Sequence, residues 1–317
     1  MSLKKSIVAG GIASALLLSA CSTSTPAEEV GDQSADVQSE VVAEETQSDE
    51  ASQSEDAAAD TIFIPAGDHD IPAVLVLPDS ASVEEPVPAI VMLHGTGSQK
   101  DEAGDGYLRL ASELADAGIA SIRIDFMGAG ESTAADKDFS LDTALTDGQK
   151  AIDYLLEQPE INAEEIGVLG WSQGGIHALN LASHDDRVRG VVTWASPSAP
   201  MEISEAQRAE AAENGYFVTE FDWREPMNTG QAWIDGMDKL EMEKVVSSIN
   251  VPVLLINGEN DDVVPPENAD TLNGFSDVSE VLIIPGADHT FNVFTDDQSA
   301  FDQLSTATVT FFVDTLK

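Results

Sequence analysis

The stretch that decides the fold is VLGWSQGGIHAL, residues 168–179. It completes an apolar, strand-like run and then places Ser172 between Gly170 and Gly174, with Gly175 directly behind them. The residues that follow have the apolar spacing of a helix. A sharp turn from a strand into a helix strains the backbone of its central residue, and glycines on either side avoid side-chain clashes there. The pattern therefore predicts that Ser172 projects from the end of a strand, above the start of a helix.

Short apolar runs alternate with helix-like stretches on both sides of this turn. Near-continuous apolar runs are typical of strands that are buried on both faces of a parallel sheet. Alternating strands and helices indicate an α/β fold, with a mainly parallel central sheet that is flanked by helices. The first two strands are separated by a short Gly-Asp-His-Asp turn (67–70) and could form an antiparallel hairpin at one edge. The predicted strands are 62–64, 73–77, 89–93, 120–126, 166–169, 190–194, 253–257 and 281–284, and the predicted helices are 107–117, 141–156, 174–183, 268–272 and 301–316.

The interval after the sixth predicted strand breaks this alternation. Between Trp194 and Val251 there is a charged, helix-like run, 204–213, but no convincing strand, and so long a connection should carry structure of its own. We interpret residues 196–250 as an inserted cap. The alternative is a surface excursion with packed aromatic side chains. The aromatic residues that we expect to contact a substrate are Tyr216, Phe217, Trp223 and Trp233.

The first residues have the pattern of an export signal. Lys4 and Lys5 precede an apolar run, 7–18, which is well short of the about 20 residues needed to cross a bilayer. The run ends in L-S-A-C, and this tetrapeptide resembles the bacterial lipobox. The resemblance implies a lipoprotein signal peptide over 1–20, lipidation of Cys21, and anchoring to the outer face of a bacterial cell membrane or to an outer membrane. The alternative is a plain signal peptide with an incidental cysteine.

Residues 21–60 are expected to form an acidic, disordered tether. After Cys21, the only cysteine of the chain, this segment holds no Lys, Arg or aromatic residue. Such a composition buries too little apolar surface to order itself, and its like charges keep it extended. Residues 61–317 are long enough for one domain with a sizeable core. The formal net charge of −44 disfavours nucleic acids and anionic lipid surfaces as partners, whereas nothing in the sequence sets an oligomeric state.

Two residues nearer the C-terminus could make the serine reactive, because a reactive serine needs a base for its proton and a group that orients the base. His289 lies in PGADHTF, 285–291, just after the last predicted strand, and histidine can act as a general base near neutral pH. Asp261 lies in NGENDDVVP, 257–265, after the penultimate strand, where its carboxylate could accept the imidazole Nδ1 proton. The adjacent Asp262 is the alternative orienting group.

A glycine-rich loop, HGTGS at 94–98, follows the third predicted strand. Such a loop can present a backbone N–H group towards the serine. We assign one oxyanion donor to the N–H of Thr96 and a second to the N–H of Gln173. The alternative is a tight turn without a catalytic part. The chain has no C-x-x-C or H-E-x-x-H pattern, so we expect neither a metal site nor a cofactor.

Taken together, these residues resemble the α/β-hydrolase superfamily. Ser172, Asp261 and His289 follow one another in the order of that superfamily's triad members. Its triad acid is the aspartate of G-x-x-D-x-x-V-P, and the match of residues 258–265 to this motif favours Asp261 over Asp262. The resemblance covers nearly all of the predicted domain, and it implies the α/β-hydrolase fold with a cap inserted after the sixth strand.

Within the superfamily, the pattern is most similar to bacterial cinnamoyl and feruloyl esterases and to related carboxylesterases. The shared features are S-Q-G-G at the turn, the run GIASIRIDF at 118–126 and the length of the insertion. The HGTGS loop is one residue shorter than the family's usual H-G-F-T-G form, which leaves the donor assignment to Thr96 open by one position. The insertion carries no motif that identifies a substrate.

The resemblance implies a serine carboxylester hydrolase. The acyl group of a small-molecule ester would transfer to Ser172, with His289 as the base, and water would then release the acid. The implied substrates carry small, medium or aromatic, feruloyl-like acyl groups. An aminopeptidase or dipeptidyl peptidase would apply the same chemistry to an amide. A surface binding lipoprotein that kept the fold without activity is the third alternative, and a fluorophosphonate probe should not label its Ser172.

Overall fold

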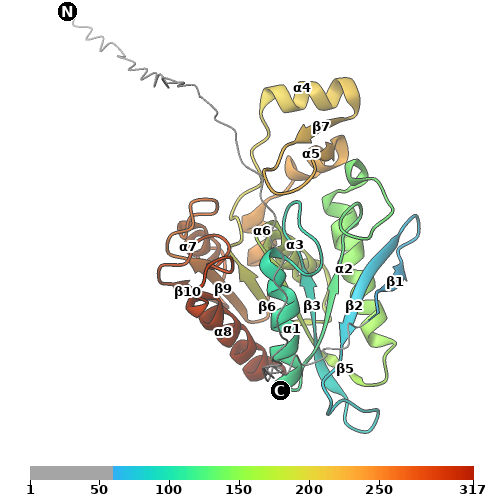
Figure 1. The fold of residues 1–317 in the computed structure, drawn as a ribbon, viewed down its shortest axis with the longest axis vertical. Helices are drawn as coiled ribbons and strands as arrows, with labels where there is room; N and C mark the ends of the chain where they lie inside the picture. The colour runs from blue at the N-terminus through green and yellow to red at the C-terminus, as the bar shows by residue number, and fades with distance from the viewer. Residues whose placement is uncertain (1–59) are drawn as a thin grey trace, which may run out of the picture. The chain divides into compact units, whose positions relative to one another are not determined.

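The computed structural model describes residues 60–317, and their central feature is one mixed sheet (Figure 1). Its strands are β1 (Ile62–Pro65), β2 (Asp70–Val76), β3 (Val87–Leu93), β4 (Ala120–Ile124), β5 (Ile161–Trp171), β6 (Val188–Trp194), β9 (Val253–Gly258) and β10 (Ser279–Ile284). The eight strands lie in the order β1-β2-β4-β3-β5-β6-β9-β10. β2 pairs antiparallel with β1 and with β4, and the other pairings in this sheet are parallel. The predicted strands and the edge hairpin are therefore confirmed.

The N-terminal predictions concern a part of the chain that the structure does not describe. The predicted signal peptide (1–20), the lipidation site at Cys21 and nearly all of the predicted tether (21–60) lie outside the described residues. None of the helices in residues 60–317 is long and apolar enough to cross a membrane.

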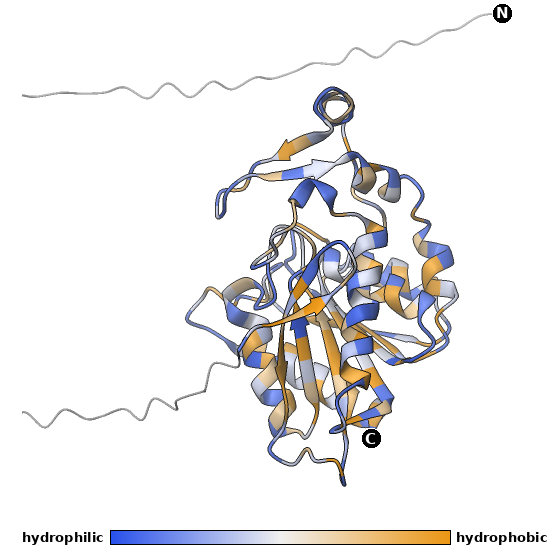
Figure 2. Ribbon diagram, turned by 90° about the vertical axis from the view of Figure 1, so that its right-hand side faces the viewer, coloured by the Kyte–Doolittle hydropathy of each residue, from blue (hydrophilic) through white to orange (hydrophobic). Residues whose placement is uncertain are grey.

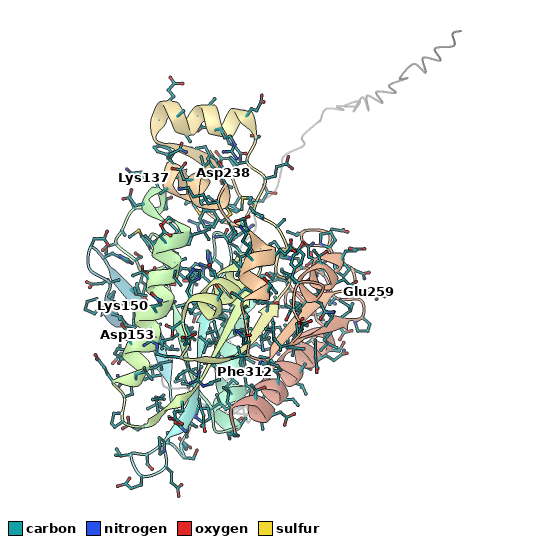
Figure 3. The ribbon with its side chains drawn as sticks, turned by 180° about the vertical axis from the view of Figure 1, so that it is seen from behind. Lys137, Lys150, Asp153, Asp238, Glu259 and Phe312 are labelled. Carbon is teal, nitrogen blue, oxygen red and sulfur yellow. The ribbon has the colours of Figure 1, made fainter. Side chains whose placement is uncertain are left out.

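Helices cover both faces of the sheet. They are α1 (Gly106–Asp116), α2 (Leu141–Leu156), α3 (Gln173–His184), α7 (Glu267–Asn273) and α8 (Ser299–Leu316). Successive residues of a strand point to opposite faces, so Val91 of β3 joins the apolar core under α2 and α3, whereas Ile90 joins the core under α1 and α8. Figure 2 shows hydrophobic residues concentrated in the strands between these helical layers. Phe312 of α8 (labelled in Figure 3) is fully buried and packs on β5 at Gly167, where a Cβ would lie 2.7 Å from its ring.

The segment between β6 and β9 forms a small substructure of its own. It holds α4 (Glu205–Asn214), β7 (Tyr216–Thr219), β8 (Met227–Gly230), α5 (Gln231–Met237) and α6 (Met242–Ser247). The helix predicted at 204–213 is present as α4. The sequence predicts no strand in this segment, and that prediction is wrong, because β7 and β8 pair antiparallel in a separate two-stranded sheet. Each strand has only four residues, too few for an alternating pattern to stand out in the sequence.

This insertion is fastened to the rest of the domain at one side. Asp136, in the short 3-10 helix η2 (Asp136–Asp138), accepts hydrogen bonds from the backbone N–H of Asn228 at 2.7 Å and from its Nδ2 at 3.1 Å. Figure 1 places α4, β7 and α5 beyond the ends of the sheet strands. The inserted substructure is thus positioned over the edge of the sheet that carries Ser172.

Candidate active site

Ser172 occupies the strained turn that the sequence predicts between β5 and α3. Its backbone angles are φ 54° and ψ −123°, a conformation that L-residues rarely adopt. Its N–H donates to the carbonyl oxygen of Trp194 at 2.7 Å, which fixes the turn against β6. The turn has no room for side chains at its glycines, because a Cβ at Gly170 would collide with the backbone of Gly174, and one at Gly174 with the carbonyl oxygen of Leu93. The geometry forces the serine side chain out of the sheet.

The structure brings the three candidate residues of the triad together. His289 Nε2 lies 3.1 Å from Ser172 Oγ, and His289 Nδ1 lies 2.8 Å from Asp261 Oδ2. The residues come from three loops, which follow β5, β9 and β10 at one edge of the sheet. The histidine side chain is 19% exposed and the Asp261 side chain is fully buried. A proton can therefore pass from the serine to an imidazole that a desolvated carboxylate orients.

Asp261 is held in place by its own loop. Its Oδ1 accepts the backbone N–H groups of Val263 at 2.9 Å and Val264 at 2.7 Å. Asn257 Nδ2 approaches Oδ2 at 3.4 Å and donates to the Val264 carbonyl oxygen at 2.8 Å. Asp262, the alternative orienting group, is exposed and makes no hydrogen bond with the histidine. The geometry thus favours Asp261, and Asn257 is a supporting residue that the sequence motif does not reveal.

The loop at 94–98 lies directly beside the serine. A Cβ at Gly95 would lie 3.2 Å from Ser172 Cβ. The N–H of Gly95 is occupied, because it donates to Glu102 Oε1, and Ser98 Oγ donates to Glu102 Oε2 at 2.7 Å. Within residues 60–317, the backbone N–H groups of Thr96 and Gln173 have no hydrogen-bond partner. These are the two groups that the sequence assigns as oxyanion donors, and they are available to a ligand. Glu102, which shapes the loop, was not predicted.

Two buried histidines belong to the hydrogen-bond network that holds this loop. His94 Nε2 accepts the N–H of Phe126 at 3.1 Å, and His94 Nδ1 donates to the Gly95 carbonyl oxygen at 2.9 Å. His177 lies 3.1 Å from Gln173 Nε2, and the Gln173 Oε1 in turn accepts the Thr96 hydroxyl. Burial, with the neighbouring His94, lowers the pKa of His177 to about 3, so its ring is neutral at physiological pH. A chain of neutral hydrogen bonds therefore couples the loop to α3.

A main cleft of about 1290 Å³ opens above the serine. Ser172 and His289 line it together with residues 95–98, and the insertion forms a further wall. Trp223 and Trp233, two of the four aromatic residues expected to contact a substrate, line this cleft. Of the other two, Phe217 is buried in the apolar core, and Tyr216 is not among the residues that line the cleft.

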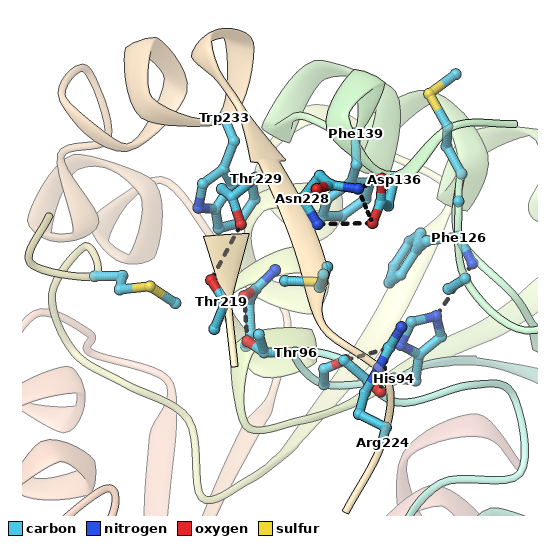
Figure 4. Close-up of a pocket in the computed structure, with 18 residues that line it drawn as sticks. His94, Thr96, Phe126, Asp136, Phe139, Thr219, Arg224, Asn228, Thr229 and Trp233 are labelled. Carbon is cyan, nitrogen blue, oxygen red and sulfur yellow. Dashed lines mark hydrogen bonds between the residues drawn. The ribbon is translucent and has the colours of Figure 1, made fainter. Parts of the chain in front are cut away.

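A smaller side cavity of about 70 Å³ adjoins the cleft at Thr96 and Gln173 (Figure 4). Its lining includes the aromatic rings of Phe126 and Phe139, with Trp233 stacked on Phe139 at a centroid distance of 5.4 Å. Neither Ser172 nor His289 lines it. The cavity can therefore accept a compact, flat or branched apolar group that reaches past the two free N–H donors.

Arg224 joins the insertion to the loop beside the serine. Its Nη1 donates to the Gly97 carbonyl oxygen at 2.6 Å, and Phe221 packs on Gly97, where a Cβ would lie 3.0 Å from its ring. Gly97 has φ +70°, which favours glycine over any other residue. The insertion therefore contacts the same loop that offers the Thr96 N–H.

One wall of the side cavity depends on a buried carboxylate. Asp147 of α2 accepts the N–H of Met127, a wall residue, at 3.1 Å, and it lies 2.9 Å from His69 Nε2. Burial raises the pKa of Asp147 to about 6. Burial also lowers the pKa of His69, but its hydrogen bond with Asp68 and the charge of Asp147 outweigh this, so the pKa rises overall. Both groups bind protons more tightly in the folded than in the unfolded protein.

The stability that these two groups contribute should therefore be present at low pH and be lost as pH rises through their folded pKa values. Asp147→Asn removes one of them while keeping the side-chain shape. We compare the free energies of unfolding of the variant and of wild type. As the pH rises from 4 to 7, wild type should lose up to about 3 kcal/mol of stability relative to the variant. Urea unfolding of both proteins at several pH values measures this. If the difference in unfolding free energy stays constant with pH, or if wild type gains stability relative to the variant, the raised pKa of Asp147 would be contradicted.

Comparisons with known proteins give the context of this site. A family model described as alpha/beta hydrolase fold matches residues 88–222. The chain is 28% identical over 182 residues to 2,6-dihydropseudooxynicotine hydrolase of Paenarthrobacter nicotinovorans, covering 56% of this chain and 45% of the relative. It is 28% identical over 163 residues to the putative hydrolase YtaP of Bacillus subtilis (strain 168), covering 45% of this chain and 54% of the relative. The chain thus spans about half the length of these two curated relatives.

A solved structure of Est1E from Butyrivibrio proteoclasticus, with ferulic acid bound, superposes with a TM-score of 0.66 at 19% sequence identity. The superposition covers 80% of this chain and 98% of Est1E. At this identity, the likeness concerns the fold, which agrees with the fold class expected from the sequence.

Proposed function

Because the chain has the α/β-hydrolase fold, we propose that it is a serine hydrolase that cleaves carboxylic esters through an acyl-enzyme on Ser172. The observation that carries the proposal is the hydrogen-bonded series from Ser172 Oγ to His289 Nε2 and from His289 Nδ1 to Asp261 Oδ2. This series lies beside two free N–H donors and at the base of a cleft. A reactive serine, a base, an orienting carboxylate and oxyanion donors are the parts that acyl transfer requires.

Each step of the reaction can be assigned to an atom of the site. His289 Nε2 takes the proton of Ser172 as Oγ attacks the ester carbonyl carbon, and Asp261 stabilises the imidazolium that forms. The N–H groups of Thr96 and Gln173 donate to the carbonyl oxygen as it becomes negative. His289 then protonates the departing alcohol. A water molecule, activated by the same imidazole, attacks the acyl-enzyme and releases the acid.

The aromatic side cavity supports a substrate with a compact acyl group, aliphatic or aromatic. Phe139 and Trp233, which stack on each other, line this cavity, where their rings can contact an aromatic acyl group. The bound ferulic acid in the structure of Est1E supports the same class. The sequence at 18–21 supports export and anchoring by a lipid on Cys21.

The proposal is tested by assaying the purified protein on p-nitrophenyl acetate, butyrate and octanoate, on methyl ferulate and on alanine p-nitroanilide, with Ser172→Ala as the blank. We expect Ser172-dependent turnover of the esters, with butyrate or methyl ferulate hydrolysed faster than octanoate. Hydrolysis of the anilide with little ester turnover would assign the protein to the peptidases instead. Absence of any Ser172-dependent turnover would overturn the proposal.

A further inference from the structure

The cleft above Ser172 is rimmed by unusually exposed apolar side chains. Among the large apolar residues of 60–317, the three with the highest exposed fractions are Phe294 (71%), Val263 (69%) and Trp223 (64%). All three line the main cleft. Single exposed apolar side chains are common on protein surfaces, but a cluster around a cleft marks a binding site. We call these three residues the apolar rim.

The rim comes from three segments that are far apart in the chain. Val263 follows Asp261 in the loop after β9, Phe294 follows His289 in the loop after β10, and Trp223 lies between β7 and β8. The loop that carries Phe294 is fixed, because Trp171 Nε1 donates to the His289 carbonyl oxygen at 3.2 Å. The rim is therefore built by the two loops that supply the base and its orienting carboxylate, together with the insertion.

The chemistry of the reaction decides which half of an ester meets the rim. The leaving alcohol receives its proton from His289 Nε2, so its oxygen must lie within hydrogen-bond reach of that atom. Val263 and Phe294 belong to the loops of Asp261 and His289, so they lie on this alcohol side. The carbonyl oxygen instead faces the N–H groups of Thr96 and Gln173, where the side cavity begins, and none of the cavity's lining residues comes from either of those two loops.

The two binding regions also differ in size and in chemistry. The side cavity holds about 70 Å³, far less than the main cleft of about 1290 Å³, which limits the size of the acyl group. The rim exposes apolar side chains to solvent. An apolar alcohol that covers them removes apolar surface of both partners from water, which favours binding. The formal net charge of −44 disfavours an anionic alcohol. A sugar alcohol would exchange its hydrogen bonds with water for contacts with apolar side chains, which costs free energy.

Resting on the proposed function, we propose that the substrates are esters of a compact acyl group with a large, uncharged, apolar alcohol, and that Val263 and Phe294 of the rim bind that alcohol. The rim is then a specificity determinant that acts on the leaving group. A substrate with a long acyl chain and a small alcohol should fit the site poorly.

Two isomeric esters test this directly, because hexyl acetate and ethyl hexanoate contain the same atoms and differ only in which side carries the long chain. With rates followed by titration of the released acid and normalised to alkaline hydrolysis, wild type should favour hexyl acetate in kcat/KM by about tenfold. A ratio near one, or a preference for ethyl hexanoate, would overturn the inference. The proposed function would stand in that case, provided that p-nitrophenyl acetate is hydrolysed in a Ser172-dependent manner.

These two residues are tested by Phe294→Ser and Val263→Ser, which change exposed side chains. Each should lower the hexyl acetate to ethyl hexanoate ratio severalfold, towards one. Phe63→Ser is the matched control, since Phe63 is 56% exposed on β1 and lines neither the cleft nor the side cavity. The control should keep the wild-type ratio. If the variants keep the wild-type ratio, or if the control loses it equally, these residues do not bind the alcohol.

Discussion

Replacing Ser172 by alanine should lower kcat for p-nitrophenyl butyrate by about a millionfold, to the level of the blank reaction. The reason is that Ser172 Oγ is the only atom of the series that can form the acyl-enzyme, while His289 and Asp261 remain in place without a nucleophile. The fold should persist, because alanine can occupy the same strained backbone position and the Ser172 N–H keeps its bond to Trp194. Initial rates and a thermal melt of the same preparation measure both effects.

Ser183→Ala is the control for this variant. Ser183 lies on the same helix, α3, its hydroxyl donates to the Asn180 carbonyl oxygen at 2.8 Å, and it does not line the cleft. It should retain wild-type rates. Turnover in folded Ser172→Ala that approaches the wild-type rate would mean that another residue is the nucleophile.

The second large effect is expected at Asp261. Asp261→Asn should lower kcat by about 10⁴-fold, because an amide in this position no longer stabilises the imidazolium and favours the wrong imidazole tautomer. The two backbone N–H groups that Asp261 Oδ1 accepts should keep the asparagine in place. The loss should appear in kcat more than in KM, since Asp261 is fully buried and does not line the cleft.

Asp262→Asn makes the same chemical change one residue further along the chain. Asp262 is exposed and makes no hydrogen bond with His289, so this variant should keep the wild-type kcat. If Asp262→Asn instead loses activity while Asp261→Asn keeps it, the orienting group has been assigned to the wrong aspartate.

The sequence predicts the strands and the three candidate residues of the triad because both rest on local patterns. Apolar runs are read within a few residues, and Ser172, Asp261 and His289 each follow such a run directly. Parallel strands end at the same edge of a sheet, so three residues at strand ends could be expected to meet. The preference for Asp261 over Asp262 rests on the resemblance of residues 258–265 to the superfamily's G-x-x-D-x-x-V-P motif, and the contact of Asp261 with His289 agrees with it.

The remainder of the site depends on contacts between distant segments, which carry no local pattern. Glu102 reaches back to the N–H of Gly95, and His94 accepts the N–H of Phe126. In the sequence each reads as an ordinary polar residue. The length of the insertion alone predicts it, so its aromatic residues cannot be divided from sequence into those that line the cleft, such as the exposed Trp223, and those that do not, such as the buried Phe217.

The most direct test of the central claim is to locate the covalent adduct of a fluorophosphonate on the purified protein by mass spectrometry. Trypsin releases residues 151–187 as one peptide, which contains both Ser172 and Ser183, so fragmentation must separate the two. We predict a single adduct on Ser172, absent from Ser172→Ala and retained in Ser183→Ala. A folded wild-type protein that stays unlabelled, or that carries the adduct on another residue, would contradict the assignment of Ser172 as an activated nucleophile.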